Sequence, residues 1–371
     1  MPTPRAPLIT ALVLAVLTLE TASPPSEPHV TPAVSYLPWF VTSGDASEAA
    51  LLAVRQSSAP YRTYRSTGPG IQPDDRFRAG SITKTFVATV VLQLAGEERL
   101  LLSDSVDTYL PGLVRGHGND GRRITLRALL THTSGLSDYT DALPSGDPAR
   151  TGGAGPSAQP LTAEEAVLTA TARPPVSASG DYAYSNTNYA LLGLIIRRVT
   201  GHSYAAEIRR RILIPLRLHG TSLPGARTDL PSPHSTGYHR SADDGSLRDV
   251  TAIDPRAAGA AGELISTLAD LNRFYAALLG GRLLPAAELA TLLNTRTAQG
   301  SYGMGIYPQR LSCGTTVWGH SGRILGSYAR TAATRDGGHV LTFRVNTDTP
   351  PGRTLETALL EAEFCQKQTR S

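Results

Sequence analysis

The last quarter of the chain carries the pattern that most restricts its fold. Short segments rich in β-branched or alternating apolar residues follow one another there, separated by Gly-rich or Asp-Gly turns such as Asp336-Gly337. These segments span 302–307, 315–318, 327–334 and 340–346. They predict a meander of antiparallel strands, and helical periodicity at 354–364 predicts a packed terminal helix after it.

Helical periodicity predicts further helices in the rest of the chain. The clearest segments are 49–56, 81–95, 188–200 and 267–279. Gly96 and Gly201 follow two of them, in the position where glycine commonly ends a helix. Since helices dominate the middle third, we expect an α/β protein of the α+β type, with an antiparallel sheet flanked by helices and a mostly helical second lobe.

The length of 371 residues favours two lobes, because it exceeds what one hydrophobic core usually organises. We assign 36–96 and 256–371 to a sheet-and-helix lobe, and 97–255 to the mainly helical lobe. Within the second lobe, the segment 144–160 has almost no apolar side chains to bury, which predicts a flexible surface loop.

The first 25 residues have the composition of a secretory signal peptide. Arg5 precedes an uncharged apolar run at 8–19, and small residues follow. That run is too short to span a bilayer, which takes about 20 residues. A buried helix is the alternative, although Pro24 and Pro25 would end it. Because no later segment is apolar enough to anchor the chain, we expect a secreted, extracellular protein without a stable membrane anchor.

Export bears on the two cysteines, Cys313 and Cys365, because an oxidising compartment favours a disulfide over a redox or metal pair. Two free thiols are the alternative. The net charge is only +4 and the arginines are scattered, so the sequence does not predict a nucleic-acid groove.

The strongest local motif is Ser81-Ile82-Thr83-Lys84, which opens an apolar helix. One turn separates Ser81 from Lys84, so both side chains lie on one face, near the free N–H groups of the helix start. Of 35 basic residues only Lys84 and Lys367 are lysines. An ammonium can lose its proton and act as a base, whereas a guanidinium cannot. Otherwise, Ser81 would be an ordinary N-cap and Lys84 a solvated charge.

Two further motifs carry candidate site residues. Tyr184 and Asn186 lie in a predicted turn before the helix at 188–200. A tyrosine hydroxyl next to a cationic lysine can have a lowered pKa and serve as a proton shuttle. Alone, Asn186 would more often be a turn or cap residue. His320-Ser321-Gly322 follows a predicted strand, and the glycine would let a substrate approach the backbone closely.

Together, Ser81-x-x-Lys84, Tyr184-x-Asn186 and His320-Ser321-Gly322 resemble the three signatures of the serine penicillin-recognising superfamily. The closest resemblance is to soluble exported D-alanyl-D-alanine carboxypeptidases related to class C β-lactamases. It extends through the segments FRAGSITKTF, LLTHTSGLSDYT, YAYSNTNYALLG and WGHSG. It implies a Cys313–Cys365 bridge and a structural role for His132.

The resemblance implies that Ser81 attacks the penultimate D-alanine carbonyl of a peptidoglycan stem peptide, and that β-lactams acylate it. Water would release the acyl group, as in a carboxypeptidase, or an acceptor amine would take it, as in a transpeptidase. Lys84 and Tyr184 would share the proton relay, and the N–H groups of Ser81 and Arg323 would bind the oxyanion. Asn186 would hold the substrate amide and His320 would orient the Tyr184 side. No cofactor or metal is implied, and a monomer is the default.

Several positions depart from the family pattern. Tyr307 stands where the closest relatives carry an arginine for the substrate carboxylate, and Arg323 replaces a small hydroxyl residue but could bind a carboxylate itself. Glu263 stands where a small residue is usual, and we expect its carboxylate near the cleft. The stretch 56–75 looks too short for the two early strands of relatives, so the sheet could lack strands.

Other functions remain open at this point. The same serine machinery serves esterases and β-lactamases, and the departures also fit a non-catalytic binding protein. An α/β-hydrolase is disfavoured because no G-x-S-x-G elbow occurs, and metal hydrolysis because no H-E-x-x-H motif occurs.

Overall fold

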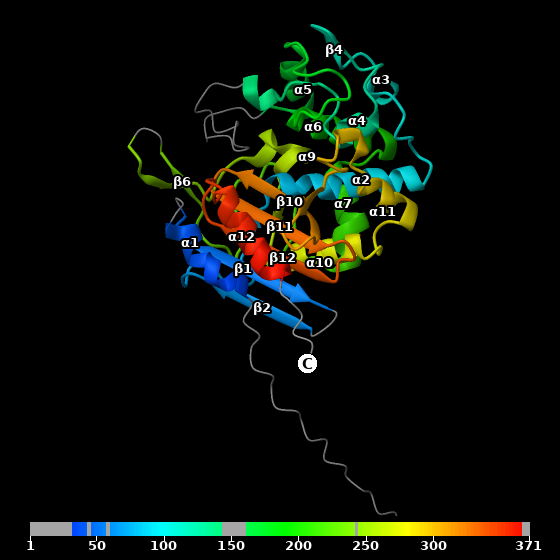
Figure 1. The fold of residues 1–371 in the computed structure, drawn as a ribbon. Coiled ribbons are helices and arrows are strands. Elements are labelled where there is room, and N and C mark those ends of the chain that lie inside the picture. Colours follow the sequence, from blue (N-terminus) through cyan, green and yellow to red (C-terminus); the bar gives the residue numbers. More distant parts are fainter. Residues whose placement is uncertain (1–31, 43–45, 57–59, 143–160, 242–243, 366–371) are drawn as a thin grey trace, which may run out of the picture.

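The computed structural model describes residues 32–365 except 43–45, 57–59, 143–160 and 242–243. Its centre is a six-stranded antiparallel sheet in the order β2-β1-β12-β11-β10-β9 (Figure 1). The strands are β1 (Ala49–Arg55), β2 (Tyr61–Ser66), β9 (Tyr307–Arg310), β10 (Thr316–Ile324), β11 (Ser327–Thr334) and β12 (His339–Val345). The predicted signal peptide and the predicted loop at 144–160 lie outside the described residues.

The predicted meander is confirmed in three of its four strands. β11 has the predicted bounds, β12 differs by one residue at each end, and β10 extends well beyond 318. The predicted strand at 302–307 is wrong in its bounds, because β9 begins only at Tyr307. The preceding Gly305 has φ of +70°, and a Cβ there would lie 2.7 Å from the Lys84 carbonyl oxygen. The segment 302–306 therefore packs as a tight turn against the helix that carries Lys84.

The predicted helix at 49–56 is wrong, because this segment is strand β1. Its sequence AALLAVR is buried on both faces. Ala50 and Leu52 belong to one hydrophobic core, while Ala49, Leu51 and Ala53 belong to the other. A short apolar run buried on both faces has no period that separates strand from helix. The two early strands are therefore present as β1 and β2, and the expectation that the sheet lacks strands is wrong as well.

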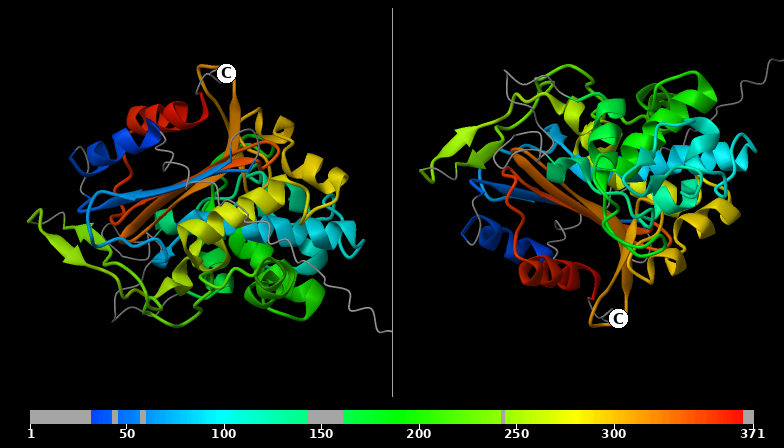
Figure 2. Two further views of the ribbon diagram at one scale, coloured as in Figure 1. Left: turned by 90° about the horizontal axis from the view of Figure 1, so that it is seen from below. Right: turned by 90° about the horizontal axis from the view of Figure 1, so that it is seen from above.

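Helices cover both faces of the sheet (Figure 2). On one face lie α1 (Leu37–Thr42) and α12 (Arg353–Phe364), which contribute Phe40 and Leu359 to the smaller core. On the other face lie α2 (Thr83–Gly96) and α10 (Leu268–Leu279), in the larger core. The predicted antiparallel sheet flanked by helices is confirmed.

The regular elements between α2 and α9 (Gly259–Gly262) are mainly helices, and they lie next to the large core. They are α3 (Val106–Tyr109), α4 (Leu126–Leu130), α5 (Ala163–Thr171), α6 (Asn186–Thr200), α7 (Tyr204–Ile208) and α8 (Ile214–Leu216). Two small hairpins, β4–β5 (Arg115–Gly116, Asn119–Asp120) and β6–β7 (Tyr238–Arg240, Leu247–Asp249), lie among them. The helix α6 starts two residues before the predicted one and ends where predicted, at Thr200, followed by Gly201 in a left-handed conformation.

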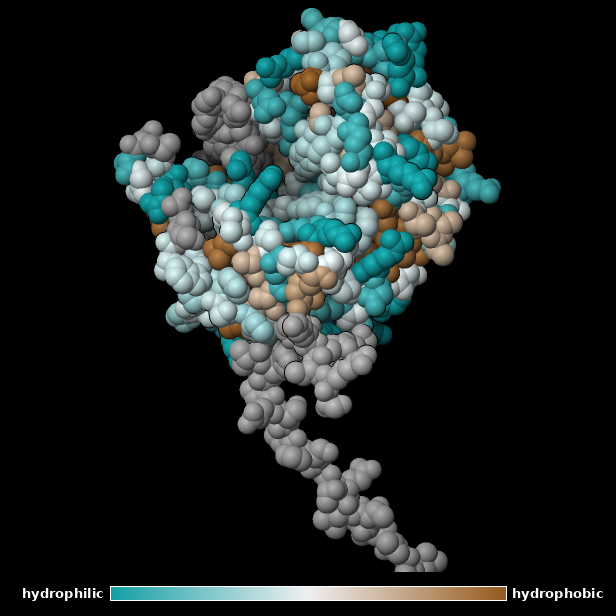
Figure 3. Space-filling model, in the orientation of Figure 1, coloured by the Kyte–Doolittle hydropathy of each residue, from teal (hydrophilic) through white to brown (hydrophobic). Residues whose placement is uncertain are grey.

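The remaining short elements connect these layers. β3 (Phe77–Arg78) pairs with β8 (Ile265–Ser266), and α11 (Ala286–Leu292) packs against α2. The face shown in Figure 3 is mostly hydrophilic, with apolar residues in small scattered groups. Among the described residues, none of the helices is both long and apolar enough to cross a bilayer.

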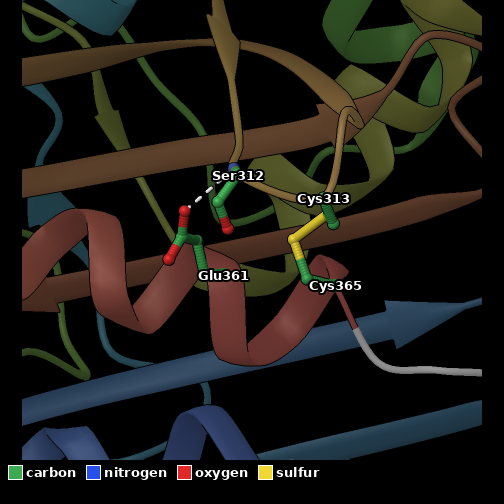
Figure 4. Close-up of a disulfide and its surroundings, with 4 residues drawn as sticks. All are labelled: Ser312, Cys313, Glu361 and Cys365. Carbon is green, nitrogen blue, oxygen red and sulfur yellow. Dashed lines mark hydrogen bonds between the residues drawn. A yellow bond between two sulfur atoms is a disulfide. The ribbon is translucent and has the colours of Figure 1, made fainter.

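The predicted disulfide is confirmed. Cys313, in the turn between β9 and β10, is bonded to Cys365 at the end of α12 (Figure 4). One helical turn before that end, the Glu361 carboxylate accepts a hydrogen bond of 2.9 Å from the Ser312 backbone N–H. The bridge therefore fastens the terminal helix to the sheet at the β9–β10 turn.

Candidate active site

Ser81 lies at the start of α2, in a single 3-10 turn (Gly80–Ile82) that joins β3 to the helix. Two glycines bring this turn against β10. Gly80 has φ of +53°, and a Cβ there would lie 2.7 Å from the Arg323 backbone nitrogen. A Cβ at Gly322 would lie 1.8 Å from the Ala79 carbonyl oxygen and 3.0 Å from the Ser81 nitrogen. Only glycine at both positions permits this contact of the two backbones.

The predicted nucleophile and its two neighbours come together. Lys84 Nζ lies 2.9 Å from Ser81 Oγ, and Tyr184 Oη donates to the same oxygen at 2.8 Å. Lys84 Nζ also donates to Asn186 Oδ1 at 2.8 Å and to the Ala261 carbonyl at 2.7 Å. Residues from α2, from the segment 184–186 and from α9 thus converge on Ser81 and Lys84.

Lys84 is fully buried and forms no ion pair with the described residues. Burial lowers its pKa to about 7, and only the nearby Asp138 carboxylate opposes this shift. Desolvation penalises the charged ammonium, so a large fraction of the amine is neutral near neutral pH. The scarcity of lysine in the sequence therefore coincides with one lysine whose environment favours the uncharged amine.

The predicted lowering of the Tyr184 pKa is wrong in direction. The pKa of this hydroxyl is raised well above 10, because desolvation outweighs the hydrogen bond with Ser81. Lys84 Nζ lies 4.9 Å from the ring centroid, on the face of the ring, where it contacts the π system. Tyr184 lines the cleft and remains a neutral phenol.

Asp138 is a site residue that the sequence reasoning missed. Its Oδ2 accepts hydrogen bonds from the backbone N–H and from Nδ2 of Asn186, both at 2.9 Å. Its Oδ1 accepts two more, from Thr140 N–H and the Thr140 hydroxyl. Since Nδ2 faces this carboxylate, Oδ1 of Asn186 faces Lys84. The residue lies in LLTHTSGLSDYT, one of the segments that carried the family resemblance, and its acidic side chain was the available indication.

His320 was expected to orient the Tyr184 side, but its hydrogen-bond partner is Tyr302. Its Nε2 is 2.7 Å from Tyr302 Oη, and Nδ1 lies against the Ser321 carbonyl oxygen. Burial lowers the His320 pKa to about 3, so the ring is neutral. The Tyr302 ring lies 6.4 Å from the Tyr184 ring. His320 therefore positions Tyr302, which lies between it and the Ser81 side of the cleft.

His132 supports Tyr184 instead. Its ring lies 4.2 Å from the Tyr184 ring, and Nδ1 accepts a hydrogen bond from the Ser185 backbone N–H at 3.2 Å. Asn188 Nδ2 lies 3.1 Å from the same nitrogen. This buried histidine holds the segment that carries Tyr184, which agrees with the structural role implied by the resemblance.

Glu263 does not line the cleft, so the expectation that its carboxylate lies near the cleft is wrong. The side chain is buried, accepts a hydrogen bond of 2.6 Å from Tyr204 and another from the Gly225 N–H. Burial raises the pKa of this carboxyl. Its neighbour Gly262 lines the cleft, but the chain turns Glu263 away from it.

Ser81 opens onto a cleft of about 920 Å³. Its walls combine tyrosines with groups of both charges. The acids are Asp138, Asp141 and Glu356, and the cations are Arg323 and Arg353. Arg323 is exposed. Among the described residues, no group of three or more histidine, cysteine, aspartate or glutamate side chains is arranged to hold a metal ion.

Tyr307 on β9 occupies the position where an arginine for the substrate carboxylate was expected from the resemblance. Tyr307 Oη donates to Ser321 Oγ at 3.0 Å, and the guanidinium of Arg330 lies 4.2 Å from the centroid of the Tyr307 ring. Arg330 is fully buried and pairs with Glu356. The Tyr307 ring therefore covers the buried guanidinium of Arg330, and Arg323 is the exposed cation on β10.

The antiparallel sheet has helices on both faces, and a serine and a buried lysine lie one turn apart at the start of α2. These features define a member of the serine penicillin-recognising superfamily. The profile of the family described as Beta-lactamase matches residues 40–366. The chain belongs to this family.

Curated relatives carry penicillin-binding names. Penicillin-binding protein 4 of Amycolatopsis lactamdurans is 30% identical over 239 residues, covering 62% of this chain and 59% of that protein. Putative penicillin-binding protein PbpX of Bacillus subtilis is 30% identical over 237 residues, covering 63% of this chain and 54% of that protein. The matches thus span little more than half the length of these relatives.

Two solved structures are similar over nearly the whole chain. A D-stereospecific amidohydrolase from Streptomyces sp. is 39% identical, with a TM-score of 0.81, and the match covers 90% of this chain and 98% of that one. D-amino acid amidase from Ochrobactrum anthropi, in complex with L-phenylalanine amide, is 25% identical with a TM-score of 0.73, covering 89% and 97%. The octameric penicillin-binding protein homologue from Pyrococcus abyssi, 21% identical, shares the fold.

Proposed function

We propose that this chain is a serine amidohydrolase that cleaves amide or peptide bonds whose acyl part is a D-amino acid residue, through an acyl-enzyme on Ser81. The observation that carries the proposal is the hydrogen bonding of Lys84. A neutral amine has two N–H donors and one lone pair. The Asn186 and Ala261 oxygens accept the two donors, so the lone pair is left for the Ser81 hydroxyl.

Lys84 is accordingly the first base. Its pKa of about 7 leaves it partly neutral at physiological pH, whereas the raised pKa of Tyr184 opposes the phenolate that a tyrosine base would need. As Ser81 Oγ bonds to the substrate carbonyl carbon, Lys84 takes the hydroxyl proton. Tyr184 Oη, which is 2.8 Å from Ser81 Oγ, donates its proton to the leaving nitrogen. The proton that Lys84 took from Ser81 then passes to Tyr184, which makes the phenol neutral again.

The oxyanion is assigned to the backbone N–H groups of Ser81 and Arg323. The close contact of their two backbones, which Gly80 and Gly322 permit, supports this assignment. β10 pairs with β9 only as far as Gly319, so within the described residues its edge beyond Gly319 is open toward the cleft. An extended substrate can align along that edge.

The acyl group is inferred from charge and similarity. The Asp138 carboxylate lies in the cleft beside Asn186, where the acyl residue of a substrate on Ser81 would extend. A free α-ammonium on that residue would be attracted to it, whereas an acylated nitrogen would not. The similarity to a D-stereospecific amidohydrolase and a D-amino acid amidase supports an amide of a D-amino acid as the substrate class.

A D-alanyl-D-alanine carboxypeptidase, acylated by β-lactams, is the second candidate. Arg323 favours it, because this exposed guanidinium next to the oxyanion position is suited to a bidentate pair with a terminal carboxylate. The similarity to penicillin-binding proteins supports it too. Export into the cell-wall space suits either candidate, and the disulfide fits an oxidising compartment.

The test compares five acyl donors with purified protein and with Ser81→Ala. They are D-phenylalanine amide, L-phenylalanine amide, an N-acylated D-Ala-D-Ala peptide, a simple ester and a cephalosporin. The proposal expects release of ammonia from the D-amide, at least about tenfold faster than from the L-amide, and none from the variant. D-alanine release without amide hydrolysis would establish the second candidate, and ester or cephalosporin turnover alone would overturn both. Intact mass after penicillin treatment tests acylation of Ser81.

A further inference from the structure

A fully buried cation, Arg330 on β11, lies directly behind one wall of the cleft. Its guanidinium lies 4.2 Å from the centroid of the Tyr307 ring. Nη2 donates to Gln309 Oε1 at 3.4 Å, and Nε lies 3.4 Å from Glu356 Oε1. Tyr307, Gln309 and Glu356 all line the cleft, whereas Arg330 does not. Arg330 is therefore separated from the cleft only by the side chains that contact it.

Most of the hydrogen-bond donors of this guanidinium are unused. Nε and Nη1 have no hydrogen-bond partner among the described residues, and the bond that Nη2 donates is long. Because a guanidinium has one N–H on Nε and two on each Nη, three N–H groups lack an acceptor. A carboxylate can accept two such donors at once. Arg330 would therefore bind a carboxylate strongly if a ligand could reach it.

The Tyr307 ring prevents this access, because it covers the guanidinium and is held in place by its neighbours. Its hydroxyl donates to Ser321 Oγ at 3.0 Å, and its ring stacks on the Tyr302 ring with centroids 6.2 Å apart. Ser321 on β10 is also the residue that pairs with Arg330 on β11. The tyrosine is thus fixed over the cation by a hydrogen bond at one point and by ring packing at another.

The leaving group of a substrate on Ser81 would extend along this wall. Tyr184 protonates the leaving nitrogen in the proposed mechanism, and its ring lies 6.4 Å from the Tyr302 ring. Tyr302 in turn stacks on Tyr307. The acyl residue extends the other way, toward Asp138. A leaving group that begins at Tyr184 therefore passes Tyr302 and reaches Tyr307.

We infer that Tyr307 determines leaving-group specificity, because its ring keeps Arg330 out of contact with the substrate, and that the cleft consequently favours uncharged leaving groups over those with a free carboxylate. This inference rests on the proposed amidohydrolase function. Glu356 acts in the same direction, since its carboxylate lines this wall and would repel another. Arg323 and Arg353 line the cleft but are exposed, and ion pairs in water contribute little.

The experiment uses D-phenylalanyl-glycine and D-phenylalanyl-glycinamide, which differ only in the terminal carboxylate. Calorimetry gives the Kd of each with Ser81→Ala protein, which lacks the nucleophile, and kcat/KM is measured with protein that retains Ser81. The Ser81→Ala protein should bind the glycinamide compound at least as tightly as the acid. Adding Tyr307→Ala should improve binding of the acid relative to the glycinamide by about tenfold or more, since a charge-assisted pair with Arg330 can form. A further Arg330→Met change should remove this gain.

Tyr307→Phe is the matched control, because it keeps the ring over Arg330 and removes only the hydroxyl, so it should retain the original preference. Tyr307→Val, with a side chain suited to a strand, replaces Tyr307→Ala if that variant does not fold. An unchanged Kd ratio in the folded variant, a gain that persists without Arg330, or a preference of more than about tenfold for the acid before Tyr307 is changed would overturn the inference.

The two proposals fail in different ways. If protein that retains Ser81 binds both compounds but hydrolyses neither, the proposed function is wrong, and the Kd ratios of the variants still decide the role of Tyr307. If both compounds are hydrolysed and the ratios do not respond to Tyr307→Ala, only the specificity inference is wrong. If neither compound binds, both are wrong.

Discussion

The protonation of Lys84 should set the pH dependence of acylation. Only the neutral amine can take the Ser81 proton, so kcat/KM rises with pH as Lys84 loses its proton. With a pKa of about 7, about one tenth of the protein is in the active form at pH 6 and about nine tenths at pH 8. The expected increase is therefore about tenfold between pH 6 and pH 8, with a plateau above.

Burial of Lys84 is the reason that its amine can act as a base near neutral pH. At the ordinary lysine pKa of 10.5, about 0.03% of the amine would be neutral at pH 7, against about half at a pKa of 7. The buried site thus increases the concentration of the base at pH 7 about 10³-fold.

Lys84→Arg tests the same reasoning by a substitution that keeps the charge but cannot lose a proton. It should lower kcat/KM for D-phenylalanine amide by about 10²–10⁴-fold, the usual contribution of a general base. The measurement is ammonia release from pH 5 to pH 9, with circular dichroism and Tm to show that the variant is folded. A wild-type profile that is flat over this range, or a folded variant with more than a tenth of wild-type activity, would refute the role of Lys84.

Three further outcomes are expected. Because the Asp138 carboxylate favours the charged form of Lys84, Asp138→Asn should shift the acidic limb of the pH profile to lower pH and should also reduce the plateau, both measured as kcat/KM. Replacing Cys313 and Cys365 by serine should lower the free energy of unfolding by about 4 kcal/mol on the chain-entropy account, measured by chemical denaturation; an unchanged midpoint would contradict this. Gly322→Ala should reduce kcat about 10²-fold or more with substrate binding less affected, because its Cβ would displace the strand from the nucleophile turn.

The sequence predicted the features that depend on near neighbours in the chain. Ser81 and Lys84 share a helix face because they are one turn apart. The later strands were recognised because alternating residues and Asp-Gly turns are local patterns. By contrast, the pattern of AALLAVR predicts a helix although the segment is strand β1, because burial on both faces removes the two-residue period. The bounds of β9 were missed because a turn packed against α2 precedes it.

The surroundings of Lys84 depend on folding. The amino-acid sequence establishes which groups are present: a serine, a lysine that can lose its proton, a tyrosine and an amide. It did not determine that the Ala261 carbonyl, 177 positions away, would accept the second N–H of Lys84, that Glu263 would turn away from the cleft, or that the pKa of Tyr184 would rise. Residue identity and spacing are properties of the chain, whereas desolvation and hydrogen-bond partners depend on which distant atoms surround a group after folding.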